Sequence, residues 1–137
     1  MSLFSALAGT QRKRLGSVRR LYQEDRKAKT PAARGMRLLK AWLSTEQRMA
    51  FERFGYFDVI GSVTGKTYRI YPGRYANVHE LGENGLPREG WCFVPDGNLV
   101  PGDIMLAQKI ALETAECATL AIANRFPPSL TILRNHR

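Results

Sequence analysis

The chain has 137 residues, enough for one compact domain and too few for two domains of typical size. Its two cysteines exclude a disulfide-rich scaffold, and no apolar run approaches the roughly 20 residues that a membrane-spanning helix needs. The formal net charge of +9 is large for a chain with ordinary apolar and charged fractions, and it favours an anionic partner.

The excess positive charge lies in the N-terminal third of the chain. Residues 1–43 contain eleven Lys and Arg against two acids, Glu24 and Asp25, whereas residues 44–137 contain ten of each kind. The N-terminal segment therefore holds the whole net charge of +9. We predict a basic helical arm over residues 1–43 and a small α+β domain over residues 44–137.

Three helices are predicted before the first strand. The first is basic and amphipathic, with an apolar face of Leu15, Val18, Leu21 and Tyr22. Thr30 and Pro31 predict the start of a second helix that extends to about Leu43, because Thr can cap a helix and Pro is tolerated at the first helical position. Ser44 and Gln47 form a capping-box pattern that begins a third helix.

The hydrophobic period changes from about 3.6 to 2 after Gly55, which fits the left-handed position beyond a helix end. Alternating and β-branched residues predict three or four short strands, near residues 57–63, 67–71, 75–81 and 91–94. Turn residues separate them, including Gly65 at Thr64–Lys66 and Asn84-Gly85.

A long last helix is predicted to open at Pro101-Gly102-Asp103, with Asp103 as its cap. Its expected buried stripe consists of Leu106, Ile110, Cys117, Leu120 and Ala121. Lys109, Glu113 and Glu116 are expected on its solvent face. The fold class is therefore α+β, with N-terminal helices, an antiparallel meander of three or four strands and a long C-terminal helix packed on the sheet.

Residues 61–67, Gly-Ser-Val-Thr-Gly-Lys-Thr, are similar to a phosphate-binding P-loop but depart from it twice. Only three residues separate the glycines where the loop needs four, and a strand rather than a helix follows. We therefore predict a hairpin turn in which Gly65 has a positive φ.

Candidate anion-binding residues come from the arm and from one face of the sheet. Basic residues can contact phosphates, and interleaved aromatic rings can stack on bases. Strand alternation places Tyr68 and Ile70 on one side and Arg69 and Tyr71 on the other, which is expected to be the open side. The candidates are Arg12, Lys13, Arg14, Arg19, Arg20, Arg26, Lys27, Lys29, Arg69, Tyr71 and Arg74.

The sequence contains no recognisable catalytic or metal-binding pattern. His79, His136, Cys92 and Cys117 lack the spacing of metal ligands, and His79 is expected at the surface. No nucleophile motif or paired carboxylates are recognisable either. We expect a protein that is not an enzyme and that uses no metal or cofactor, with both cysteines reduced as in a cytoplasmic protein.

Several short segments between residues 44 and about 126 form a recognisable set. They are Glu46-Gln47-Arg48, Phe51-Glu52, 56–61 (Tyr-Phe-Asp-Val-Ile-Gly), 64–70 (Thr-Gly-Lys-Thr-Tyr-Arg-Ile), Asn77-Val78, Trp91-Cys92 and 103–109 (Asp-Ile-Met-Leu-Ala-Gln-Lys). On these residues, this part of the chain resembles a family of small uncharacterised bacterial proteins. The resemblance implies a shared domain and no particular chemistry, and it leaves the first 43 residues outside.

These features favour a nucleic-acid-binding protein whose arm contacts phosphates. One alternative is a structural or assembly subunit, of a virion or another large complex, whose arm contacts neighbouring subunits. Another is a peripheral module that binds an anionic membrane surface through the apolar and basic residues of the arm.

Overall fold

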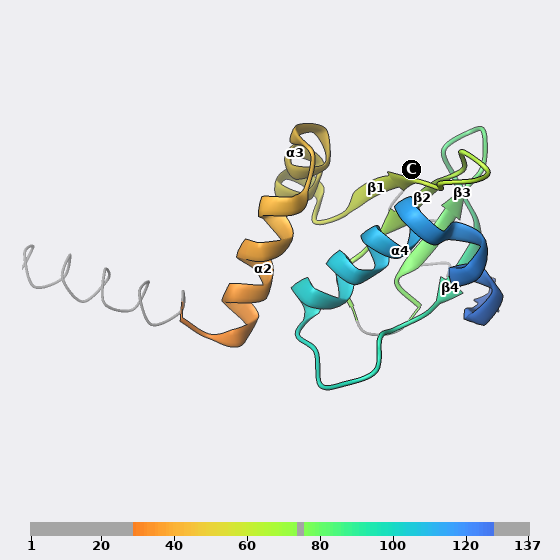
Figure 1. The fold of residues 1–137 in the computed structure, drawn as a ribbon. Helices are drawn as coiled ribbons and strands as arrows, with labels where there is room; N and C mark the ends of the chain where they lie inside the picture. The colour runs from red at the N-terminus through yellow and green to blue at the C-terminus, as the bar shows by residue number, and fades with distance from the viewer. Residues whose placement is uncertain (1–28, 74–75, 128–137) are drawn as a thin grey trace, which may run out of the picture. The chain divides into compact units, whose positions relative to one another are not determined.

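The computed structural model describes residues 29–73 and 76–127, which form an α+β fold as predicted (Figure 1). The first predicted helix, Arg74 and the segment from residue 128 lie outside the described residues. The chain divides into residues 1–34 and 35–137, and the whole sheet belongs to the second unit. The described elements are α2 (Pro31–Trp42), α3 (Thr45–Phe54), β1 (Phe57–Ile60), β2 (Thr67–Ile70), β3 (Val78–Leu81), β4 (Pro87–Cys92), α4 (Pro101–Ile122) and β5 (Asn124–Phe126).

The starts of α2 and α3 that were predicted from capping residues are confirmed. The Oγ1 of Thr30 accepts a hydrogen bond from the N–H of Ala33 at 3.2 Å, and Pro31 is the first residue of α2. At α3, the Oγ of Ser44 accepts from the N–H of Gln47 at 3.1 Å. The Oε1 of Gln47 accepts from the N–H of Ser44 at 3.0 Å, which completes the capping box. Gly55 ends α3 with a φ of 79°.

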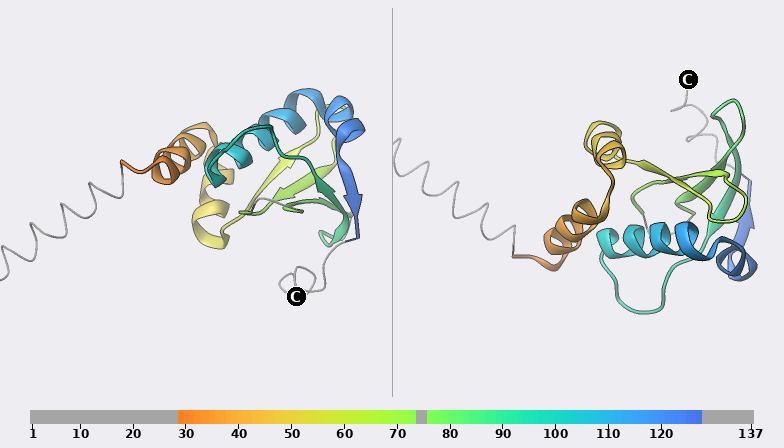
Figure 2. Two further views of the ribbon diagram at one scale, coloured as in Figure 1. Left: turned by 90° about the horizontal axis from the view of Figure 1, so that it is seen from below. Right: turned by 45° about the horizontal axis from the view of Figure 1, so that its top comes forward.

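The sheet is an antiparallel meander in which each strand pairs with the next along the chain (Figure 2). It has five strands where three or four were predicted. β3 begins later than predicted, and β4 lies at Pro87–Cys92 rather than 91–94, because pairing with β3 places Trp91 opposite Val78. β5 was missed because its three residues are too few for an alternating pattern to show.

Helix α4 starts differently from the prediction that Asp103 caps it. Its N-cap is Val100, whose side chain makes no capping hydrogen bond, and Pro101 follows in the first turn. Proline supplies a helical φ and needs no hydrogen-bond acceptor there, so α4 starts without a side-chain cap. Asp103 lies within the first turn, where its negative charge favours the positive end of the helix dipole.

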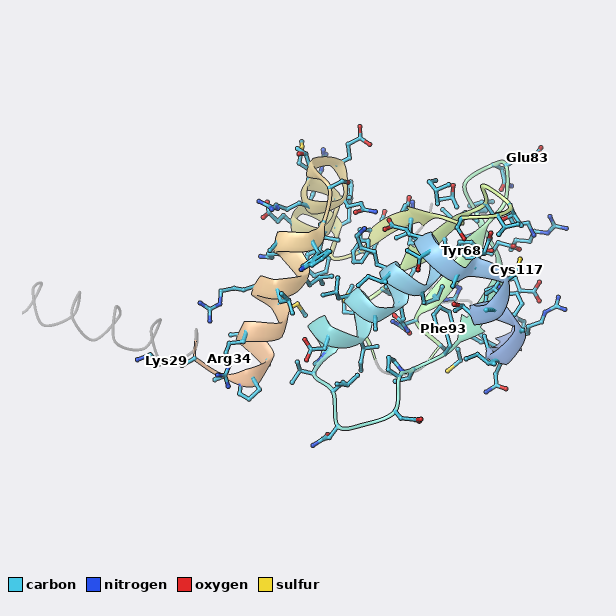
Figure 3. The ribbon with its side chains drawn as sticks, in the orientation of Figure 1. Lys29, Arg34, Tyr68, Glu83, Phe93 and Cys117 are labelled. Carbon is cyan, nitrogen blue, oxygen red and sulfur yellow. The ribbon has the colours of Figure 1, made fainter. Side chains whose placement is uncertain are left out.

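The stripe predicted for α4 is only partly right. Leu106 is buried as expected, but Ile110 is 43% exposed and Cys117, labelled in Figure 3, is exposed too. Glu116, expected on the solvent face, is fully buried. Ala115 has non-helical dihedral angles (φ −147°, ψ 50°), so the two halves of α4 do not share one helical phase. An apolar stripe that is continued past Ala115 with the phase of the first half therefore identifies the wrong residues as buried in the second half.

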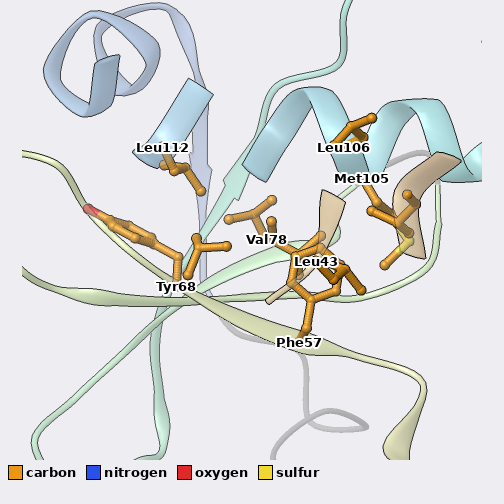
Figure 4. Packing of buried hydrophobic residues seen from close by; sticks show 10 residues of the cluster. Leu43, Phe57, Tyr68, Val78, Met105, Leu106 and Leu112 are labelled. Atoms are coloured by element: carbon orange, nitrogen blue, oxygen red, sulfur yellow. The ribbon is translucent and has the colours of Figure 1, made fainter. Parts of the chain in front are cut away.

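The hydrophobic core lies between α4 and one face of the sheet (Figures 2 and 4). Phe57, Tyr68 and Val78 of the sheet meet Met105 and Leu112 of α4 in this layer (Figure 4). Leu39 of α2 and Leu43, the residue directly after this helix, belong to the same cluster. A Cβ at Gly102 would overlap the main-chain carbonyl of Gly35, so the backbones of α2 and α4 approach closely at these two glycines. This contact fixes α2 from Gly35 onward against α4.

The opposite face of the sheet carries a row of aromatic rings. Tyr71 and Phe126 each meet the ring of His79 edge-on, with centroids 5.5 and 5.6 Å away. His79 is fully buried, so its expected surface position is wrong. The prediction failed because Phe126 belongs to β5, which lies two strands from His79 and was not anticipated.

Candidate nucleic-acid interface

Most of the predicted anion-binding residues lie outside the described part of the chain. These are Arg12, Lys13, Arg14, Arg19, Arg20, Arg26, Lys27 and Arg74. Of the rest, Lys29 is exposed two residues before α2, and Arg69 and Tyr71 lie at the C-terminal half of β2 and directly after it. The structure therefore brings together only the two sheet residues of the predicted set.

Arg69 is held by groups of its own domain. Its Nε lies 2.7 Å from Oδ1 of Asp58 and its Nη2 lies 3.0 Å from Oδ2, a bidentate ion pair across β1 and β2. The guanidinium also lies 4.2 Å from the ring centroid of Tyr56. Burial by itself would lower the pKa of Arg69, but Asp58 more than offsets this, so the pKa is raised. The charge of Arg69 is thus balanced inside the domain.

The other ion pairs of the sheet and α4 follow the same pattern. Each joins a cation to an acid that is close in the fold, so these cations are paired within the domain. The pairs are Lys66 with Glu80, Lys109 with Glu113, and Arg125 with Glu89. Among the described cations of this region, Arg88 is the exception.

The cations of α2 and α3 differ from those of the sheet. Within residues 29–73 and 76–127, Lys40, Arg48 and Arg53 form no ion pair with an acid. The Nη2 of Arg48 donates instead to the main-chain carbonyl of Lys40 at 2.9 Å. Arg53 lies over the ring of Phe54 at 5.1 Å. Helix α3 also contains two acids, Glu46 and Glu52, whereas α2 contains three cations and no acid, so the net positive charge of these two helices lies on α2.

Two large apolar side chains are exposed near the C-terminal end of α2. We define the α2 patch as Leu38 and Trp42. Leu38 and Trp42 are four residues apart on the helix, and they are 48% and 61% exposed. Neither residue was among the predicted site residues, because a helical pattern alone does not show which of its apolar residues stay exposed.

The glycine-rich turn after β1 is a hairpin, as predicted, and Gly65 has a φ of 70°. Its main-chain donors are occupied by Glu116 of α4. Oε1 of Glu116 accepts from the N–H groups of Val63 at 2.9 Å and Thr64 at 2.7 Å. Oε2 accepts from the hydroxyls of Thr64 and Tyr68, both at 2.5 Å. The turn thus cradles an anion from its own chain.

The hydrogen bonds to Glu116 determine its ionisation. Burial alone would raise the pKa of Glu116, but the donors of Thr64, Tyr68 and Val63 outweigh burial and lower the pKa to about 2. Burial and the neighbouring carboxylate raise the pKa of the Tyr68 hydroxyl well above its usual range. Glu116 is therefore a buried, satisfied anion, and its role is to hold the turn to the helix.

A groove of about 570 Å³ runs beside α3 and β1 and is lined by Glu46, Asp58 and Glu113 among others. Asp58 is paired with Arg69, and Glu113 accepts from Nε2 of Gln47 at 3.1 Å and pairs with Lys109.

In the described part of the chain, no three His, Cys, Asp or Glu side chains are arranged to hold a metal ion. No described helix is long and apolar enough to cross a membrane.

The sequence was compared with known protein families, curated proteins and solved structures. No family model, curated protein or solved structure matches the sequence. The resemblance of residues 44–126 to small bacterial proteins therefore stays a prediction, and the function has to be argued from the residues of this chain.

Proposed function

We propose that this chain is a non-enzymatic, nucleic-acid-binding protein that uses its N-terminal arm to contact phosphates. The observation that carries the proposal is the separation of charge. Residues 1–43 hold eleven cations and two acids, while residues 44–137 are neutral. In the described part of the chain, ion pairs hold four of the five cations of the sheet, its turns and α4.

The physical reason is counterion release. Each cation placed beside a phosphate releases a condensed counterion, so a segment rich in Lys and Arg binds nucleic acid strongly at low salt and weakly at high salt. Contacts of this kind position a protein without reading sequence. The eight arm cations Arg12, Lys13, Arg14, Arg19, Arg20, Arg26, Lys27 and Lys29 are the proposed phosphate contacts. We also propose secondary contacts by Arg69, Tyr71 and Arg74. Arg69 is paired with Asp58, which balances its charge.

A cytoplasmic location fits this partner and fits two cysteines that form no disulfide, Cys92 and Cys117.

Fluorescence anisotropy with a labelled oligonucleotide at low and moderate salt tests the proposal. We expect binding that weakens steeply as salt is added. If the chain does not bind oligonucleotides but sediments with anionic vesicles, it is a peripheral membrane module instead. A stable oligomer in light scattering, with no nucleic-acid binding, would support an assembly subunit.

A further inference from the structure

Helix α2 carries three cations that are not among the proposed phosphate contacts. Residues 1–43 contain eleven Lys and Arg, of which eight are the proposed contacts of the arm, and the other three, Arg34, Arg37 and Lys40, lie in α2. They follow one another at intervals of three residues, which places neighbours on the same side of a helix. We define these three residues as the α2 row. Helix α2 contains no acid.

The α2 row points away from the hydrophobic core. Leu39 is fully buried and marks the side of α2 that packs on the core. With 3.6 residues per turn, Arg34 and Arg37 lie about 140° and about 160° around the helix from Leu39, and both are exposed. Lys40 lies about 100° from Leu39 and is half-buried. The outward side of α2 is therefore its basic side.

The stability of the helix does not explain the α2 row. A cation is favourable at the negative, C-terminal end of a helix dipole, so Lys40 in the last turn stabilises α2. Arg34 lies near the N-terminal end, where the dipole disfavours a cation. Like charges one turn apart also repel each other, and α2 has no acid to offset them. Contacts within α2 therefore disfavour Arg34 and Arg37, and an anion outside the helix stabilises them.

We propose that the α2 row binds the phosphate backbone of nucleic acid and continues the contacts of the arm onto the folded domain. This inference rests on the proposed function and adds a second group of phosphate contacts to it. Successive members of the row are about 4.5 Å apart along the helix axis. A duplex carries one phosphate per about 1.7 Å of its own axis, so each cation of the row can face a separate phosphate.

The position of α2 gives these contacts a consequence that contacts by the arm do not have. The backbones of α2 and α4 approach closely at Gly35 and Gly102, which fixes the helix from Gly35 onward against α4. Arg37 and Lys40 follow Gly35 in the same helix. Phosphates bound by Arg37 and Lys40 are therefore held at a fixed position relative to the sheet.

A lipid surface fits the α2 row less well than nucleic acid does. A helix that lies on a membrane inserts its apolar face, and the apolar face of α2 packs in the core through Leu39. Leu38 and Trp42 are exposed, but they lie about 100° and about 140° around the helix from Arg37. A lipid surface that buries these two side chains therefore does not cover Arg37.

The salt dependence of binding by the full chain tests the inference. The probe is the labelled oligonucleotide, single-stranded or duplex, that the natural chain binds more tightly. We expect the double variant Arg34→Gln and Arg37→Gln to make the slope of log binding constant against log salt shallower by about 1.4 for a single strand or about 1.8 for a duplex, the values for two lost phosphate contacts. Glutamine is a good helix former, so α2 persists in this variant, which thermal unfolding verifies.

Two control variants separate the position of the charge from its amount. Arg53→Gln with Arg88→Gln removes the same charge from exposed residues of α3 and β4, and it should leave the slope nearly unchanged. Arg34→Lys with Arg37→Lys keeps the charge of the row, and it should keep the slope of the natural chain.

Three results would overturn the inference while leaving the proposed function in place. These are an unchanged slope when Arg34 and Arg37 are Gln, an equal change when Arg53 and Arg88 are Gln, or a loss of slope when Arg34 and Arg37 are Lys. If the Gln variant of the row loses binding to anionic vesicles but keeps its oligonucleotide slope, the row binds lipid and the inference is wrong. If the natural chain binds no oligonucleotide at low salt, both the inference and the proposed function fail.

Discussion

Glu116 donates its main-chain N–H to the hydroxyl of Ser62 at 3.2 Å. The N–H of Ser62 in turn donates to the carbonyl of Leu112 at 3.1 Å. In an unbroken α-helix residue 116 would donate directly to residue 112, so Ser62 is inserted into the hydrogen-bond ladder where α4 breaks. The same segment places the carboxylate of Glu116 in the β1–β2 turn. The turn and the second half of α4 therefore stabilise each other.

Replacing Glu116 by Gln should destabilise the domain at neutral pH by about 3 kcal/mol, because the carboxylate pKa is lowered from 4.5 to about 2 in the folded state. The sign follows from this lowering: the stabilisation is present above the unfolded pKa of about 4.5 and is lost as the pH falls toward 2. Urea unfolding at a series of pH values measures it. Glu113→Gln, which removes a partly exposed carboxylate paired with Lys109, is the control and should have a much smaller effect. A Glu116→Gln variant as stable as the natural chain at pH 7 would contradict the assignment.

Tyr68→Phe removes one of the donors to Glu116 and leaves the ring in the core. The pKa of Glu116 should move up toward its ordinary value, so less stability is lost between pH 5 and pH 2. At neutral pH we expect a cost of about 1–2 kcal/mol. Acid titration of unfolding free energies for both proteins gives the comparison. An unchanged pH dependence would show that the Tyr68 hydroxyl does not act on Glu116.

Gly61→Ala should be more costly than Gly65→Ala, although both glycines belong to the same turn. A Cβ at residue 61 would overlap the carboxylate of Glu116, whereas a Cβ at residue 65 meets nothing within 4 Å. We expect about 1–3 kcal/mol for the overlap at Gly61. At Gly65 the cost is that of a positive φ in a residue with a side chain, about 1 kcal/mol. Thermal unfolding of the two variants ranks them, and the reverse order would argue against the described turn.

Ser44→Ala should destabilise the domain by about 1 kcal/mol, since it removes the capping hydrogen bond to the N–H of Gln47. Gln47 has a second role, because its Nε2 donates to the carbonyl of Asp58 at 2.9 Å and to Glu113. Gln47→Ala should therefore cost more than Ser44→Ala. Equal costs in denaturant unfolding would mean that the link from α3 to β1 and α4 contributes nothing.

The parts of the fold that could be predicted from sequence are those decided by neighbouring residues. Ser44 and Gln47 are three positions apart, and Gly55 and Gly65 need a positive φ at single positions, so local patterns identified them. The meander follows similarly, since each strand pairs with the next one. β5 has too few residues for a pattern.

Contacts between distant residues could not be predicted in the same way. Glu116 and Thr64 are 52 residues apart in the sequence. A charged residue in a helical pattern is expected to face solvent unless the turn that binds it is already known. Gln108 is another example, because it is buried and exchanges hydrogen bonds with Asn77, 31 residues away. A pattern of apolar residues at helical spacing does not identify a buried polar residue such as Gln108. The α2 patch was missed because exposure of Trp42 depends on which face Leu39 and Leu43 occupy.

The slope of log binding constant against log salt concentration tests the central claim most directly, namely that the N-terminal arm binds phosphates. The natural chain is compared with a variant in which the eight arm cations Arg12, Lys13, Arg14, Arg19, Arg20, Arg26, Lys27 and Lys29 are all Gln. We predict a slope of about −4 or steeper for the natural chain, and a much shallower slope with weak binding for the variant. Equal slopes for the two proteins, or no binding by the natural chain at low salt, would contradict the account.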